Sequence, residues 1–148
     1  MTCEQEREKL LQVHDLHVTF GKHRHAFEAV RGVSFDIYKG ETFGLVGESG
    51  SGKTTIGRAI IRMNPTSGGE ILYKGEKING KITREMDKKI IKEIQMIFQD
   101  PMSSLNDLAK VNYIVKEGLM NVRKHLTKEQ QDELVNQALT DVGLLPEF

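Results

Sequence analysis

The chain has few of the features that mark secreted, membrane-spanning or nucleic-acid-binding proteins. Its single cysteine, Cys3, cannot form an internal disulfide, which favours a reducing cytoplasm. Its apolar runs cover only a few residues, too few to cross a bilayer, and its charged N-terminus carries no secretion signal. Basic and acidic residues number 21 each, so no basic field exists to hold a nucleic-acid backbone. With 148 residues, 38% of them hydrophobic, the chain can bury one core.

The most informative feature that is present is a glycine-rich motif of the form G-x-x-x-x-G-K-T. Its glycines let successive backbone N–H groups point inward, into a nest that holds nucleotide phosphates. Lys53 can reach the outer phosphates as a point charge, and the Thr54 hydroxyl can ligate Mg²⁺. The predicted binding residues are Gly47, Glu48, Ser49, Gly50, Ser51, Gly52, Lys53, Thr54 and the following Thr55.

The flanks of this motif have the pattern that phosphate binding requires. Residues 42–46 form a short apolar run, which predicts a buried strand. Residues 55–63 have helical apolar spacing and stop at Asn64-Pro65. A strand, a glycine loop and a helix favour a phosphate site over a glycine-rich turn with a surface lysine.

The remaining N-terminal pattern predicts a small sheet. Strands are expected over residues 13–20 and 29–38, with a hairpin formed by 70–73 and 76–78. A charged helix is expected over 83–93, and residues 94–98 read as a strand that ends before Pro101. No cysteine or carboxylate cluster completes a metal site around the four histidines of this region, so they are interpreted as solvated loop residues: His14, His17, His23 and His25.

The C-terminal third reads as helical. One apolar stripe predicts a helix through Leu105, Leu108, Val111, Ile114, Val115 and Leu119. A capping box at Thr127 to Gln130 opens a second helix, which Gly143 ends. The residues expected to face inward on this helix are Leu134, Val135, Ala138, Leu139 and Val142.

Together, three segments resemble the ATP-binding subunit of an ABC transporter: 29–37 with 40–42, 47–55 and 94–106. The third segment is the most specific, since its sequence is typical of the oligopeptide, dipeptide and nickel importers. The resemblance implies an α/β P-loop NTPase (ABC ATPase) fold that is incomplete. It would consist of an antiparallel β subdomain, a phosphate-loop core and the start of a helical subdomain. Residues 1–148 would then be the N-terminal portion of one ATP-binding domain, with 1–101 holding the β subdomain and core and 102–148 starting the helical subdomain.

The resemblance also implies roles for residues outside the loop. Gln99 matches the Q-loop glutamine, which contacts Mg²⁺ or the attacking water, so Thr54 and Gln99 are the expected metal contacts. Phe20 matches the aromatic that stacks on adenine, with Phe27 as the alternative and a core role at the strand end as the other interpretation of Phe20. The implied cofactors are ATP and Mg²⁺.

The family's signature motif, its Asp-Glu strand end and its switch histidine do not occur in the 148 residues. The chain is therefore expected to bind ATP without efficient hydrolysis. The implied partners are the transporter's membrane subunits and a second ATP-binding subunit, on the inner face of the cell membrane, with no nucleic acid. Two alternatives stay open: a soluble ABC-type ATPase acting on DNA or ribosomes, and a regulatory module that binds nucleotide without turnover.

Overall fold

The computed structural model describes residues 7–21, 25–100, 105–106, 108–123 and 125–144. The chain divides into two units, residues 1–96 and 97–148. The predicted domain boundary between residues 101 and 102 falls outside the described residues.

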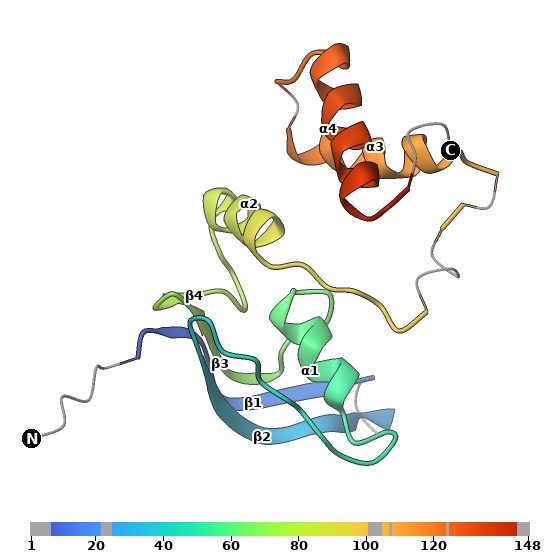
Figure 1. The fold of residues 1–148 in the computed structure, drawn as a ribbon. Coiled ribbons are helices and arrows are strands. Elements are labelled where there is room, and N and C mark those ends of the chain that lie inside the picture. The colour runs from blue at the N-terminus through green and yellow to red at the C-terminus, as the bar shows by residue number, and fades with distance from the viewer. Residues whose placement is uncertain (1–6, 22–24, 101–104, 107, 124, 145–148) are drawn as a thin grey trace, which may run out of the picture. The chain divides into compact units, whose positions relative to one another are not determined.

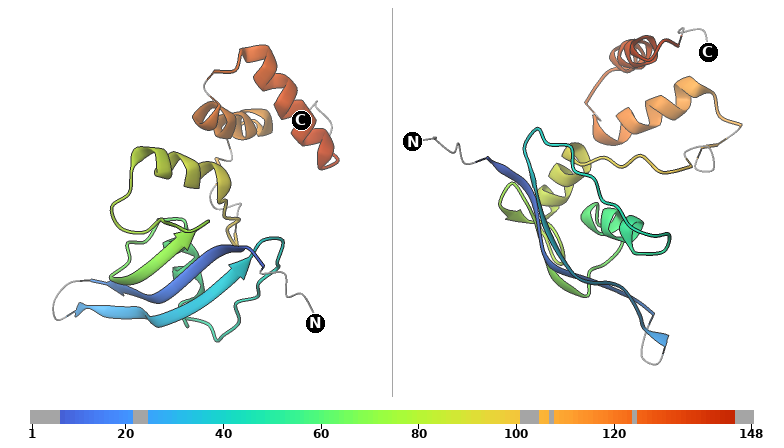
Figure 2. Two further views of the ribbon diagram at one scale, coloured as in Figure 1. Left: turned by 90° about the vertical axis from the view of Figure 1, so that its left-hand side faces the viewer. Right: turned by 60° about the horizontal axis from the view of Figure 1, so that its bottom comes forward.

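The first unit contains a four-stranded antiparallel sheet in the order β2-β1-β3-β4 (Figure 1). Its strands confirm the expected sheet and hairpin, and they are β1 Lys9–Phe20, β2 Phe27–Tyr38, β3 Gly68–Tyr73 and β4 Glu76–Lys77. Helix α1 (Lys53–Ile60) lies over one face of this sheet, as the two views of Figure 2 also show. Ile56 and Ala59 of α1 join the buried cluster that the sheet residues Val13, Leu16 and Ile71 form.

A bulge in β1 lets apolar residues on both sides of Asp15 be buried, although their spacing in the sequence breaks strict alternation. Strict alternation from Val13 would bury residue 15, but Leu16 and Val18 are the buried ones. Asp15 adopts a left-handed backbone with φ 45°, and the register with β2 shifts between Val13 and Leu16. The extra residue turns Leu16 and Val18 back into the core.

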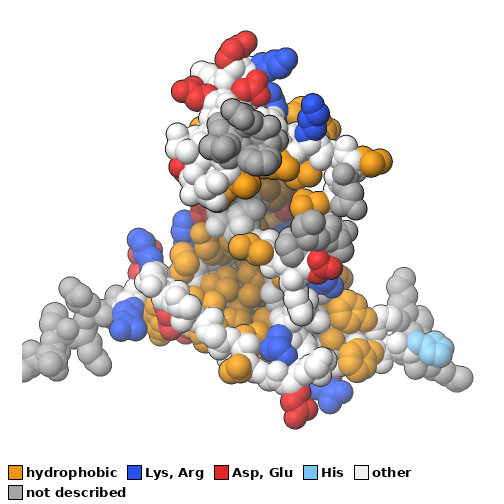
Figure 3. Space-filling view, turned by 45° about the vertical axis from the view of Figure 1, so that its right-hand side comes forward, with side chains coloured by type: hydrophobic (Ala, Val, Ile, Leu, Met, Phe, Trp, Pro, Cys, Tyr) orange, Lys and Arg blue, Asp and Glu red, His pale blue; other side chains and the backbone are white. Residues whose placement is uncertain are grey.

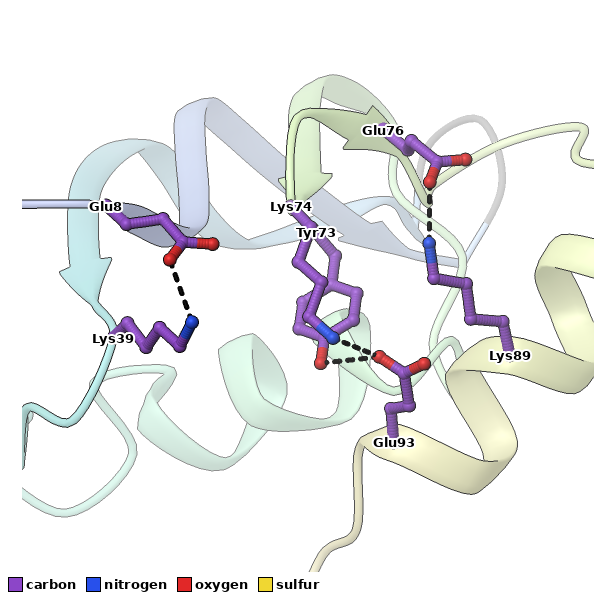
Figure 4. Close-up of polar contacts among 7 residues, drawn as sticks. All are labelled: Glu8, Lys39, Tyr73, Lys74, Glu76, Lys89 and Glu93. Carbon is purple, nitrogen blue, oxygen red and sulfur yellow. Dashed lines mark hydrogen bonds and ion pairs between the residues drawn. The ribbon is translucent and has the colours of Figure 1, made fainter.

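Helix α2 (Arg84–Glu93) confirms the charged helix expected over 83–93. Thr83 caps it by accepting a hydrogen bond from the Met86 backbone N–H, and Ile90 is its buried residue. Ion pairs join the helix to the β3–β4 hairpin (Figure 4): Lys89 lies 2.6 Å from Glu76, and Lys74 lies 2.6 Å from Glu93.

The Glu93 carboxylate, in the last turn of α2, accepts hydrogen bonds from two residues of the hairpin, Tyr73 and Lys74. The Tyr73 hydroxyl donates to Glu93 over 3.0 Å beside the Lys74 ammonium. The hydrogen bond from Lys74, followed by that from Tyr73, holds the pKa of Glu93 below its ordinary value. The last turn of α2 is thereby attached to the sheet.

The described residues of the second unit form two helices, α3 (Val111–Val122) and α4 (Lys128–Asp141), joined by an ion pair of 2.5 Å between Lys116 and Asp132. The predicted capping box is confirmed: Thr127 Oγ accepts from the Gln130 N–H while Gln130 accepts from the Thr127 N–H. Gly143, with φ 77°, ends α4 as predicted.

Three helical expectations in the chain need correction. Helix α1 ends at Ile60 instead of residue 63, because Met63 and Asn64 donate back to the Arg58 carbonyl in a closing turn. Helix α3 begins at Val111, so the stripe does not include Leu105 and Leu108; the Asn106 side chain accepts the Leu108 N–H and favours a turn there. On α4, Val135 and Leu139 are buried as expected, whereas Ala138 and Val142 are exposed.

Two predicted strands are absent from the structure. Neither residues 42–46 nor residues 94–98 form a strand. Both runs are apolar, but a strand exists only when a neighbour completes its hydrogen-bond ladder, and the sheet of the described residues leaves both runs unpaired. Val46 and Ile97 are more than nine-tenths exposed, so these runs are not buried either.

The interpretation of the histidines as loop residues is wrong for His14 and His17, which lie on β1. His17 Nδ1 lies 2.7 Å from Glu28 Oε1, and its Nε2 lies 3.2 Å from Asp15 Oδ1. The hydrogen bond to Glu28, followed by the one to Asp15, raises the pKa of His17 above its ordinary value of 6.5. The imidazole therefore joins the bulge of β1 to the start of β2. His23 lies outside the described residues.

This pairing predicts a pH-dependent stability. Because the folded pKa of His17 is raised, its contribution is full below the unfolded value of 6.5 and is lost as pH rises through the folded pKa. We expect His17→Gln to reduce the free energy of unfolding, measured by urea denaturation, more at low than at high pH within this window. His14→Gln, on the same strand, is the control. An identical pH profile in wild type and His17→Gln would contradict the assignment.

Candidate functional site

The glycine loop leads directly into α1. Gly52 is the N-cap residue of this helix in a left-handed conformation with φ 92°, and Gly50 has φ 82°. No side chain caps the helix, and its first turn contains no acidic residue. The positive end of the helix dipole and its first N–H groups are thus left for an external anion.

Lys53 is the first residue of α1, and its side chain is held by the loop. Its ammonium donates hydrogen bonds to the carbonyl oxygens of Gly47 (2.7 Å) and Glu48 (2.6 Å), with the Ser51 hydroxyl at 3.4 Å. These partners are neutral, so no carboxylate in the loop competes with an anionic ligand for the charge. The lysine predicted to reach the phosphates is therefore positioned over the same backbone that would surround them.

The loop is fixed to the sheet through Gly52. A Cβ added at Gly52 would lie 2.6 Å from the Ala29 carbonyl oxygen and 3.4 Å from Val30 Cγ2. The close approach of α1 to β2 therefore requires glycine for lack of space as well as for its φ. Sequence reasoning assigned this glycine to phosphate binding and missed the packing role, whose signal was the apolar Ala29-Val30 pair in the preceding strand.

The other end of α1 is held by Arg62, which sequence reasoning also missed. Arg62 has φ 64°, and its guanidinium donates to the carbonyl oxygens of Ile78 and Gly80 and lies 3.5 Å from Asp87. Both ends of α1 thus contact other parts of the first unit: the start packs against β2, and Arg62, just beyond the helix, bonds to the chain that follows β4.

The remaining loop residues are accessible from solvent. Thr54 is exposed and Thr55 is half-buried at the first turn of α1. Glu48, Ser49 and Ser51 are exposed in the loop. An accessible Thr54 hydroxyl suits the expected metal contact, because a hard cation such as Mg²⁺ prefers oxygen ligands and retains waters.

The structure brings Phe20 and Phe27 together as opposite residues at the end of the β1–β2 pair. Glu28 lies on the face of His17, and Val18 is buried on the other face. By alternation, Phe20 and Phe27 lie on the Val18 face, which α1 covers. The exposed fractions are 40% for Phe20 and 61% for Phe27, so both rings are available for stacking.

Gln99 is the one predicted site residue that lies in the second unit, where it is exposed. The role of Gln99 in metal binding stays a prediction. Among the described residues, no three histidine, cysteine or acidic side chains are grouped to hold a metal ion.

Comparisons with known proteins agree on one family. The model of the family described as "ABC transporter" matches residues 30–146. The oligopeptide transport ATP-binding protein AmiF of Streptococcus pneumoniae serotype 4 is 54% identical over 140 residues, which cover 95% of this chain and 46% of that protein. The dipeptide transport ATP-binding protein DppF of Lactococcus lactis subsp. cremoris is 47% identical over 142 residues, covering 94% and 45%. The chain thus spans about half the length of the curated relatives it matches.

Solved structures show the same fold. A dimeric ATP-binding cassette, MJ0796, in a post-hydrolysis state bound to ADP and Pi, aligns with a TM-score of 0.75 at 23% identity, over 88% of this chain and 56% of that one. The cbiO1 protein of Clostridium perfringens, part of the complex cbiONQ, aligns with a TM-score of 0.70 at 26% identity, over 93% and 51%. The P-loop NTPase fold of the ABC ATPases, predicted from the sequence, is confirmed. No helix in the described part of the chain has the length and apolar character needed to cross a membrane.

The packing of Gly52 generates a prediction. Gly52→Ala should destabilise the fold by at least about 1–2 kcal/mol, the cost of a left-handed backbone alone for a non-glycine residue. The contact with the Ala29 carbonyl adds to that cost. Gly44→Ala is the control, because its Cβ would meet nothing within 4 Å, and it should change the free energy of unfolding by no more than about 0.5 kcal/mol. Equal stability of the two variants in urea denaturation would refute the packing role.

Proposed function

Because this chain belongs to the ABC transporter family, we propose that it binds ATP through residues 47–55 in the energy-coupling subunit of a peptide importer. The family binds ATP, and the names of the matched relatives refer to oligopeptide and dipeptide transport. These names, and the equal numbers of basic and acidic residues, favour this function over action on DNA or ribosomes.

One observation carries the proposal: the N-terminus of α1 is open and cationic. No side chain caps the helix, its first turn has no acidic residue, and the Lys53 ammonium lies against the Gly47 and Glu48 carbonyl oxygens. A phosphate group at this position would accept hydrogen bonds from the first N–H groups of the helix. It would also attract Lys53 away from its neutral partners, since a charged acceptor forms the stronger hydrogen bond.

We propose that Mg²⁺ accompanies the nucleotide. Thr54 would supply a hydroxyl oxygen. For Gln99, a metal contact stays what the resemblance to the Q-loop glutamine implies. When bound, the metal would neutralise part of the phosphate charge. The exposed position of Thr54 at the first turn of α1 supports its part in this assignment.

The proposed partners are the importer's membrane subunits and a second ATP-binding subunit. Support comes from the relatives, which are named as transport ATP-binding proteins, and from the dimeric state of one structural neighbour. The protein would then work at the inner face of the cell membrane, held there by the membrane subunits. The cargo would be a peptide, in line with the names of the relatives.

The phosphate site is tested by titrating the purified chain with Mg²⁺-ATP and following thermal unfolding. A ligand that binds only the folded state adds about 2.7 kcal/mol of stability at one hundred times its dissociation constant. We expect this saturable shift in wild type and in Lys81→Ala, an exposed lysine outside the loop, and no shift in Lys53→Ala. A Lys53→Ala variant that is folded by circular dichroism and binds as tightly as wild type would refute the proposal.

The base contact is tested by comparing Phe20→Ala with Phe27→Ala. Stacking of a base on an aromatic ring contributes about 1–3 kcal/mol, so loss of the stacking residue should weaken ATP binding by roughly that amount. We expect the loss in Phe20→Ala. Phe20→Tyr, which keeps an aromatic ring, should restore the affinity if the loss reflects stacking. If only Phe27→Ala weakens binding, the adenine contact moves to Phe27.

A further inference from the structure

Ala29 is an extra residue in the ladder between β1 and β2. The pair Val18–Val30 is followed by the pair Thr19–Glu28, so Ala29 is left without a partner on β1. A residue that the ladder passes over in this way forms a β-bulge, which bends its strand locally. The carbonyl oxygen that the N-cap residue of α1 approaches belongs to this same residue. The contact that fixes the start of α1 is therefore made by a bulge of β2.

His17 of β1 holds β2 on both sides of this bulge. Its backbone is the register partner of Arg31, which lies two residues after Ala29. Its imidazole Nδ1 lies 2.7 Å from the carboxylate of Glu28, the residue before Ala29. One residue of β1 thus fixes both flanks of the bulge, one through the backbone ladder and the other through a side chain.

The imidazole has a second carboxylate partner within the bulge of β1. Its Nε2 lies 3.2 Å from Asp15 Oδ1. A Cβ added at Gly32 would lie 2.9 Å from that oxygen and 3.4 Å from His17 Nε2, so the glycine leaves the space that the two side chains occupy. A neutral imidazole donates a hydrogen bond from only one ring nitrogen, whereas an imidazolium donates from both. Only the protonated form of His17 can therefore donate to both carboxylates.

The two neighbouring strands supply the other charges around this imidazole. On β2 the charged residues that face it are Glu28 and the exposed cation Arg31. On β3 its register partner is Gly68, which has no side chain, and Glu70 farther along that strand is paired with Lys77 over 3.2 Å. The arginine opposes protonation of the imidazole, and the carboxylates in contact with it favour protonation.

The carboxylates prevail. The hydrogen bond to Glu28, followed by the one to Asp15, raises the pKa of His17 above its ordinary value of 6.5. The formal net charge of the chain is zero, and the face of the first unit drawn in Figure 3 carries acidic as well as basic side chains. Distant charges are of both signs and are screened by salt, so the groups in contact with the imidazole determine its charge.

We propose that His17, acting through Glu28, is a positioning residue of the nucleotide site, which rests on the phosphate site proposed above. Its protonated form holds the Ala29 bulge in the place that the start of α1 requires. Loss of the proton removes at least one of the two hydrogen bonds and leaves the bulge less restrained. The affinity for Mg²⁺-ATP is then highest when His17 is protonated, and it decreases as the pH rises through the pKa that His17 has in the nucleotide-bound state.

Calorimetric titration of the purified chain with Mg²⁺-ATP at about pH 6 and at about pH 9 tests this dependence. Between these values the wild type should lose about fivefold more affinity than His17→Gln, at the lower end of the usual coupling between two sites. The titration of ATP itself is common to both proteins and cancels in this comparison. His14→Gln, on the same strand, should behave as the wild type does.

Two failures of this titration have different meanings. An equal loss of affinity in the wild type and in a folded His17→Gln variant would overturn the positioning role and leave the phosphate site in place. A folded wild type that binds no Mg²⁺-ATP at either pH would overturn the phosphate site, and the positioning role with it.

A second variant tests the route through Glu28. Glu28→Gln keeps the size of the side chain and an acceptor oxygen but removes the charge, so it should lose the pH dependence as His17→Gln does. The double variant should behave as either single variant, because the two residues act as one pair. Glu70→Gln is the matched control on β3, where the partner of the carboxylate is Lys77. Wild-type pH dependence in a folded Glu28→Gln variant would overturn the proposal.

The reciprocal effect on the imidazole separates positioning from a general loss of stability. If protonation strengthens ATP binding about fivefold, bound ATP must strengthen proton binding by His17 by the same factor. The pKa of the imidazole, followed by NMR with and without saturating Mg²⁺-ATP, should therefore rise in the wild type and stay constant in Glu28→Gln. A pKa that ATP leaves unchanged in the wild type would overturn the proposal. So would an equal rise in Glu28→Gln, because the phosphate charge would then act on the imidazole through space.

Discussion

The contact between Gly52, the N-cap residue of α1, and strand β2 is the constraint on which the rest of the site depends. At Gly52 the backbone comes so close to the Ala29 carbonyl that a Cβ would lie 2.6 Å from it, and the φ of 92° is itself one that glycine permits. This contact fixes the start of α1 against the sheet. It therefore also fixes the direction in which the free N–H groups of the helix point.

The sheet can support the start of α1 because the bulge in β1 keeps the apolar side chains of the strand in the core. The apolar residues of β1 depart from strict alternation after Val13, and the bulge at Asp15 returns Leu16 and Val18 to the interior. His17 joins the bulge to Glu28, one residue before Ala29. The same strand pair thus contains the bulge, the imidazole with its two carboxylates and the surface against which the phosphate loop rests.

The features that could be predicted from the sequence are those set by local interactions. The helix that begins at the end of the glycine loop, the hairpin, the Thr127 capping box and the glycine end of α4 depend on neighbours within a few residues, and all of them are found. Residues 42–46 and 94–98 have the apolar pattern of strands, but a strand needs a partner distant in sequence, which local pattern cannot supply. The Gly52–Ala29 contact and the bonds of Arg62 were beyond prediction for the same reason. The binding roles of residues 47–55, Phe20, Phe27 and Gln99 stay predictions.

The central claim is that residues 47–55 and the start of α1 form a phosphate site within the first unit. Amide hydrogen exchange of this chain, with Mg²⁺-ATP and with AMP, tests it most directly, because AMP has the same base and lacks the outer phosphates. Backbone N–H groups that bind phosphate exchange more slowly, since their opening is then coupled to ligand release. The account predicts slower exchange over residues 50–55 with ATP and little change with AMP. Unchanged exchange with ATP at saturating concentration, or equal slowing with AMP, would contradict it.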